Sequence, residues 1–132
     1  MEDKSNDATP LRPEGERFLN SALVEMNLND FVNQIKNEST WANRDRNSIT
    51  IFKSETMRIV LIGLHEKAEM KEHKANGVIS VQVLDGKIEF ATDAQTMILE
   101  NNQMIALQEN ITHRVKALTE SVFLLTLAMN NK

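Results

Sequence analysis

Two stretches decide the fold: HKANGVISVQVLDGKIEF, residues 73–90, and LENNQMIALQENITHRVKAL, residues 99–118. In the first, apolar and polar residues alternate, which is the pattern of a β-strand with one buried face. The alternation predicts that Ile79, Val81 and Val83 point toward a core. Both stretches break at residue types that favour turns, so each is interpreted as strands joined by turns.

Three dipeptides mark turns in these stretches. Asp85-Gly86 stands between two strand-like runs, as the turn of an Asp-Gly hairpin does, and Asn76-Gly77 precedes another run. Asn101-Asn102 separates two further runs, and Asn tolerates the positive φ that such turns need. These dipeptides therefore predict where strands begin and end.

Strand-like runs fill the chain from Ser48 onward. They are short, rich in β-branched or apolar residues and separated by polar turns: SITIF, MRIVLIGL, GVISVQVL, KIEFAT, TMILE, MIALQ, HRVKAL and SVFLLTLAM. Eight such runs predict an all-β barrel or sandwich. The segment HEKAEMKEHKA, residues 65–75, consists of good helix formers, but its place among strands outweighs that propensity and we expect no helix there.

A short helix and an arm are expected before the strands. Apolar residues recur at offsets of three and four between residues 28 and 41, behind Asn29 or Asp30 as the expected N-cap. Residues 1–16 hold both prolines and no apolar periodicity, which predicts a flexible or docking arm. Residues 17–47 then form a strand or helix segment that packs on a barrel of residues 48–132. The apolar residues of the helix are Leu28, Phe31, Val32 and Ile35.

Composition bounds the class of protein. A chain of 132 residues is long enough for one domain. Its net charge of -4 is spread along the chain, which makes nucleic acid an unexpected partner. The chain has no apolar run of roughly 20 residues and no basic, apolar leader, so we expect no contact with membrane and a cytoplasmic location. Because cysteine is absent, any metal must be held by His and carboxylate.

The histidines are His65, His73 and His113, and each is a candidate metal ligand. His65 opens HEKAE, but Glu69 occupies the place of the second histidine in the helical zinc motif, so that interpretation fails. His73 and His113 each precede a strand and are about four strands apart, so they meet only in a closed or sandwiched sheet. The alternative is that both are ordinary surface or core histidines.

The two quoted stretches resemble the two motifs of the cupin superfamily. In words, the first motif is a glycine, five residues, His-x-His, three or four residues, Glu, six residues and Gly. With Gly86 as the closing glycine, Ile79 stands at the glutamate position and Ala75 at the second histidine position. His73 then matches the first histidine, and Lys67 stands at the opening glycine.

The second motif ends in Pro-x-Gly-x-x-His, and His113 matches its histidine. Asn102 and Asn110 stand where glycines are usual, and Gln108 stands where proline is usual. The resemblance covers about residues 48–129 and implies a cupin barrel, also called a double-stranded β-helix or jelly roll, with degenerate metal-binding motifs.

The resemblance also implies a reduced metal site. Cupin sites typically resemble a cage of three His and one Glu for iron, manganese or similar metals, and this sequence retains two of the four ligands. Glu69, Glu72 or Gln82 are possible substitutes, although alternation from Ile79 points Gln82 outward. The expected pocket is therefore mostly apolar around the two histidines, and its lining residues are Met70, Ile79, Val81, Val83, Met104 and Val115.

Two functions of different class follow. The first is a small-molecule-binding barrel of unknown ligand, with no metal site or a weak one. The alternative is a metal-dependent enzyme of oxygenase or isomerase type, in which His73 and His113 hold Fe, Mn, Ni or Zn. General acid or base catalysis by a metal-free histidine is a third option. Cupin-like barrels often pair through edge strands, and together with the arm this predicts a homodimer.

Overall fold

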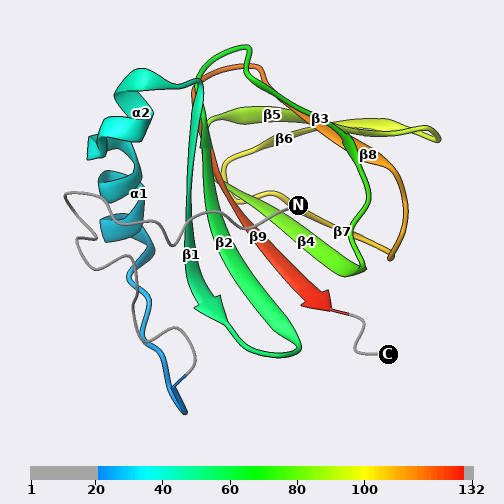
Figure 1. Ribbon diagram of the computed structural model, residues 1–132. Coiled ribbons are helices and arrows are strands. Elements are labelled where there is room, and N and C mark those ends of the chain that lie inside the picture. The colour runs from blue at the N-terminus through cyan, green and yellow to red at the C-terminus, as the bar shows by residue number, and fades with distance from the viewer. Residues whose placement is uncertain (1–20, 130–132) are drawn as a thin grey trace.

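Two antiparallel sheets form the body of the protein. The computed structural model describes residues 21–129, within which nine strands divide into a five-stranded and a four-stranded sheet (Figure 1). The expected arm of residues 1–16 lies outside the described residues. The larger sheet has the order β1 (Arg46–Lys53), β2 (Met57–Leu64), β9 (Ser121–Met129), β4 (Gly77–Asp85) and β7 (Met104–Leu107). The smaller sheet has the order β3 (Glu69–His73), β8 (His113–Ala117), β5 (Lys87–Thr92) and β6 (Thr96–Glu100).

The strands follow the predicted runs. All eight runs form strands, and the segment of helix formers forms no helix, as expected. It contains the ninth strand, β3, which was not among the predicted runs. Its residues pair with β8, so hydrogen bonding across the sheet overrides their helix propensity.

The interior lies between the two sheets, and the strand register sets which residues enter it. Ile62 pairs with Phe123, which pairs with Val83, so these three side chains share one face of the larger sheet. The next row on that face contains Leu125 and Val81. Phe90, Leu99 and Val115 reach the same core from the smaller sheet, and together these side chains form one apolar cluster. The residues that the alternation predicts to point toward the core therefore do lie on the inner face of the sheet.

The turn at Asp85-Gly86 corrects one prediction. β4 and β5, which flank it, belong to different sheets and do not pair, so the dipeptide forms a corner between sheets and the hairpin prediction was wrong. Gly86 has a φ of 105°, and a Cβ there would lie 2.4 Å from the carbonyl oxygen of Glu120. Only glycine fits this corner without displacing backbone.

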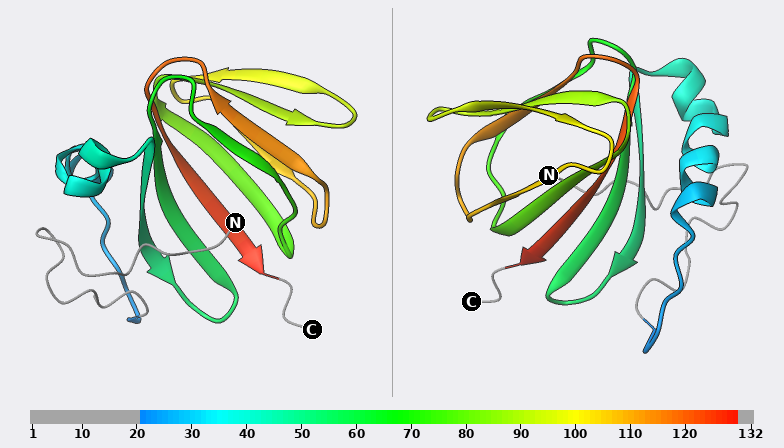
Figure 2. Two further views of the ribbon diagram at one scale, coloured as in Figure 1. Left: turned by 45° about the horizontal axis from the view of Figure 1, so that its top comes forward. Right: turned by 180° about the vertical axis from the view of Figure 1, so that it is seen from behind.

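Two short helices cover the outer face of the larger sheet, beside β1 and β2 (Figures 1 and 2). α1 (Leu28–Asn37) is the predicted helix, but its N-cap is Asn27, whose side chain accepts a hydrogen bond from the backbone of Asp30 at 3.2 Å. The predicted caps Asn29 and Asp30 were wrong, because both already lie within the first turn. Neither α1 nor α2 (Ser39–Asn43) is long and apolar enough to span a membrane.

The helices are attached to the sheet by apolar packing and by one buried polar contact. Ile35 packs against Ile49 and Leu61 on the outer face of β1 and β2. The Asn47 side chain donates to the carbonyl oxygen of Ile35 at 3.0 Å and to the carboxylate of Glu38 at 2.9 Å. Because Asn47 and Glu38 are both buried, this contact fixes the helices in one position on the sheet.

Positive φ angles test the alignment to the cupin motifs. Among the described residues other than glycine, φ is positive at Lys67 (74°), Asn102 (67°) and Asn110 (60°). These are the positions at which the resemblance places glycines, and glycine is the residue that adopts this conformation without strain. The backbone of the motifs is therefore retained although the glycines are not.

Candidate functional site

Two histidines meet in the smaller sheet. His73, at the end of β3, pairs directly with His113, at the start of β8. Their ring centroids are 4.3 Å apart, and the ring planes are inclined by 60°. Phe90 of β5 stacks on the ring of His113, with centroids 5.4 Å apart. His113 is only 1% exposed and lies in the interior, whereas His73 is half-buried at its border.

Hydrogen bonds to the backbone fix the tautomer of both rings. Nδ1 of His73 lies 2.7 Å from the carbonyl oxygen of Lys71, and Nδ1 of His113 lies 2.9 Å from that of Ile111. A carbonyl oxygen only accepts, so each Nδ1 carries the hydrogen. Each Nε2 of a neutral ring then presents a lone pair. Both Nε2 atoms are buried and have no hydrogen-bond partner among the described residues.

The surroundings keep His113 neutral. Burial lowers the pKa of His113 below its ordinary value of 6.5. The hydrogen bond to the carbonyl oxygen of Ile111 opposes that shift, and the neighbouring His73 adds to it. At neutral pH the Nε2 atom of His113 is therefore a hydrogen-bond acceptor or a metal ligand.

Most of the predicted pocket residues do face the interior. Ile79, Val81, Val83 and Val115 are at most 2% exposed and belong to the core cluster, against which Met70 packs. Met104 is a correction, since it is 55% exposed. It pairs with Gln82, and directly paired residues share a face, so both point outward.

The donor set does not fit a cupin metal cage. Ala75 and Ile79, at the two altered ligand positions, are buried and apolar. The proposed substitutes Glu69 and Glu72 are exposed, and Gln82 lies on the outer face. Within residues 21–129, no cluster of three or more His, Cys, Asp or Glu side chains is placed to hold a metal ion. Two imidazoles alone are fewer protein ligands than most metal centres use.

His65 lies outside this site. Its ring stacks on Trp41 of α2, with centroids 3.7 Å apart, and its Nε2 lies 2.8 Å from the carbonyl oxygen of Trp41. Since that oxygen accepts, Nε2 of His65 carries the hydrogen, which is the opposite tautomer to the interior pair.

Arg58 is a candidate functional residue that the sequence argument missed. It lies on β2, where period-two alternation from Val60 and Ile62 places it on the inner face. Its Nε atom is buried and has no hydrogen-bond partner among the described residues. The alternation of MRIVLIGL is a signal that places Arg58 inward, because Arg58, Val60 and Ile62 are two residues apart.

Comparisons with solved structures identify the architecture. A conserved protein of unknown function from Streptococcus pyogenes is 23% identical with a TM-score of 0.63, and the match covers 67% of this chain and 79% of that one. A cupin-2 domain protein from Shewanella frigidimarina is 16% identical with a TM-score of 0.63, covering 78% of this chain and 93% of that one. A salicylate 1,2-dioxygenase from Pseudaminobacter salicylatoxidans is 16% identical with a TM-score of 0.58, covering 64% and 26%.

Sequence comparison adds no closer relative, since no family model and no curated protein matches the chain. The strand order, the positive φ angles at the motif positions and the solved structures agree with one another. This chain therefore has the fold of the cupin superfamily.

Proposed function

We propose that the barrel interior binds a small, partly apolar molecule that donates hydrogen bonds to His73 and His113. The observation that carries this proposal is the pair of buried Nε2 atoms without partners among the described residues. A buried polar atom that lacks a partner costs about 1–3 kcal/mol, and most proteins satisfy nearly all such atoms. A ligand hydroxyl or amine at this place would supply the missing donors.

The surroundings support an apolar body for the ligand. Ile79, Val81 and Val115 lie in the same interior as the histidines and carry no polar side-chain atom. Small-molecule sites are commonly lined by apolar side chains with a few polar groups that orient the ligand. The two imidazoles are the orienting groups in this proposal.

The metal-dependent alternative is disfavoured by the donor set described above. An oxygenase or isomerase that uses Fe, Mn, Ni or Zn needs at least a third protein ligand beside His73 and His113. The fold shared with a dioxygenase does not supply that ligand among residues 21–129, because function belongs to the site rather than to the fold.

Nuclear magnetic resonance of the three imidazoles tests the proposal. The probes are propylene glycol and phenylethylene glycol, which donate hydrogen bonds, and acetophenone, which accepts but does not donate. We expect a glycol to shift the Nε2 signals of His73 and His113 saturably and to leave His65 unchanged, since His65 lies outside the interior. Acetophenone should leave all three signals in place.

Metal analysis tests the metal-dependent alternative. Purified, tag-free protein should contain no stoichiometric metal after exposure to Fe, Mn, Ni and Zn. Stoichiometric metal that is lost in both His73→Ala and His113→Ala would support the enzyme alternative and contradict the proposal, as would the failure of both glycols to reach the two imidazoles.

A further inference from the structure

We propose that the ligand also carries a carboxylate, which Arg58 binds at the end of the interior where the two histidines lie. This inference rests on the proposed function, because it names the chemical class of the molecule that the same interior takes. It follows from the position of Arg58 in the sheet, from the burial of its Nε atom and from the hydrogen-bonding roles of the two histidines.

The register of the larger sheet places Arg58 in an inward row. Arg58 pairs with Leu127 of β9, and Leu127 pairs with Ile79 of β4. Ile79 pairs in turn with Leu107 of β7. Because directly paired residues share a face, Arg58 projects from the same face as Ile79, which is 2% exposed and part of the core. Arg58 therefore stands in a row that is apolar across β9, β4 and β7 and that ends on β1 at the exposed Lys53.

Chain connections bring this row to the same end of the barrel as the histidine pair. β3 ends at His73 and β4 begins four residues later at Gly77, while β7 ends at Leu107 and β8 begins at His113. The backbone N–H of Asn110 donates to the carbonyl oxygen of Ala75 at 3.0 Å, which joins the two connections. The two connections thus join the strands that carry Ile79 and Leu107 to the strands that carry His73 and His113.

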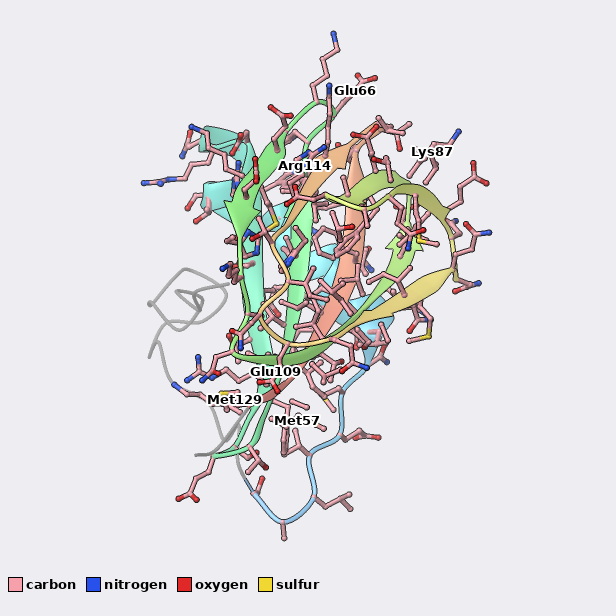
Figure 3. The ribbon with its side chains drawn as sticks, turned by 90° about the vertical axis from the view of Figure 1, so that its right-hand side faces the viewer. Met57, Glu66, Lys87, Glu109, Arg114 and Met129 are labelled. Atoms are coloured by element: carbon pink, nitrogen blue, oxygen red, sulfur yellow. The ribbon has the colours of Figure 1, made fainter. Side chains whose placement is uncertain are left out.

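Figure 3 shows at which end of the molecule β2 starts. Met57, which precedes Arg58, lies near Met129 and Glu109 at one end of the molecule, whereas Glu66 and Lys87 lie at the other. The backbone N–H of Met129 donates to the carbonyl oxygen of Thr56 at 2.8 Å, which holds the start of β2 against the end of β9. Arg58, the next residue after Met57, is thus close to this end of the molecule.

The buried Nε atom of Arg58, on a side chain that is half-buried as a whole, indicates an anionic partner. The Nε atom of Arg58 is buried without a hydrogen-bond partner among the described residues, although a charged donor is among the costliest groups to leave unpaired. A carboxylate matches the planar fork of the guanidinium with two parallel hydrogen bonds. Residues 21–129 supply no such bond to this atom, so a ligand is the partner that we assign.

The histidines and Arg58 require different groups on the ligand. The Nε2 lone pairs of His73 and His113 repel a carboxylate oxygen and accept from a hydroxyl or amine. Arg58 only donates and attracts the anion. The ligand class is therefore a small acid that carries a hydroxyl or amine and an apolar body, such as a hydroxycarboxylate.

Two matched probe sets test this class by calorimetry and by imidazole resonance. One set is lactate, propionate and propylene glycol, and the other is mandelate, phenylacetate and phenylethylene glycol. Within each set the second probe lacks the hydroxyl and the third lacks the carboxylate. We expect the hydroxy acid to bind most tightly in at least one set.

Variants of Arg58 separate charge from geometry. Arg58→Gln should weaken hydroxy-acid binding about 10- to 100-fold, the loss typical of a charge-assisted hydrogen bond, and should leave glycol binding unchanged. Arg58→Lys should recover only part of that loss, because a lysine keeps the charge without the fork. Lys53→Gln removes an exposed positive charge from the residue that pairs with Arg58, and it should have little effect.

The outcomes distinguish this inference from the proposed function. If the glycols bind and the acids bind no more tightly, or if Arg58→Gln leaves acid binding unchanged, the carboxylate assignment is wrong while the proposed function stands. If no probe of either set shifts His73 and His113, both are overturned. Glycol binding also shows that the Arg58→Gln barrel is folded.

Discussion

His73 and His113 pair directly across β3 and β8, yet each ring is held through Nδ1 by the carbonyl oxygen two residues before it. The two imidazoles are thus oriented by the same local contact on different strands. Each ring keeps a buried Nε2 lone pair for a partner that the described residues do not supply. This arrangement is the reason that we propose the pair as a binding site.

The first prediction concerns tautomers. In their neutral forms, His73 and His113 should carry the hydrogen on Nδ1 and His65 should carry it on Nε2, because each of these atoms donates to a carbonyl oxygen. Long-range proton–nitrogen correlation spectra distinguish the two forms. Three identical tautomers would show that these hydrogen bonds are not formed in solution.

The second prediction concerns pH. The pKa of His113 is lowered in the folded chain below 6.5, so the unfolded chain binds more protons in the window between the folded value and 6.5. The stabilising contribution of neutral His113 is fully present above 6.5 and is lost as pH falls through the folded pKa. Urea unfolding measured from about pH 7.5 down to about pH 5 should show this loss.

His113→Phe is the matched variant for the pH measurement. It retains an aromatic ring beside Phe90 and removes the titrating group, so the part of the pH dependence that comes from His113 should disappear. An unchanged pH profile in this variant would assign the loss of stability to other groups.

The third prediction concerns backbone strain. Lys67 has a φ of 74°, which costs a residue with a Cβ about 1–2 kcal/mol. Lys67→Gly should therefore stabilise the protein by about 0.5–1 kcal/mol after the extra entropy of the unfolded glycine is subtracted. Lys53→Gly, at an exposed strand position without positive φ, should instead destabilise it. Equal losses in both variants, measured by urea unfolding, would contradict the assignment of strain.

The fourth prediction concerns the altered ligand positions. Ala75→His combined with Ile79→Glu would add the two missing donors to His73 and His113, and this variant should take up about one divalent metal ion per chain. The control is Ala75→Phe with Ile79→Met, which adds bulk without donors. Metal analysis checks the result, and a folded double variant that takes up no metal would show that the four positions do not converge.

Much of the fold was predictable because strand patterns are local. Alternation from Ile79 to Val83 identified an inner face. The resemblance to the cupin motifs, aligned on Gly86 for Lys67 and on His113 for Asn102 and Asn110, located the positions that adopt positive φ. The helix was predictable from the spacing of its apolar residues. Its N-cap was not, because Asn27, Asn29 and Asp30 can all cap a helix and all lie just before Phe31.

Features that depend on pairing between distant strands were less accessible. Period-two alternation does not say which of the two sets of side chains in a strand points inward. Met104 was therefore predicted to line the pocket, but its pairing with Gln82 shows that it lies on the outer face. Asp85-Gly86 has the sequence of a hairpin turn, but the strands on its two sides pair with other partners. Local sequence does not specify those partners.

The sequence alone determined the strand pattern, the inward side chains of β4 and the loss of two metal-ligand positions, because each depends on residue type and spacing within a short segment. The tertiary structure decided that His73 meets His113, that His65 stays outside and that Arg58 shares a row with Ile79. These relationships join residues on different strands, and only the strand register brings their side chains to one end of the interior.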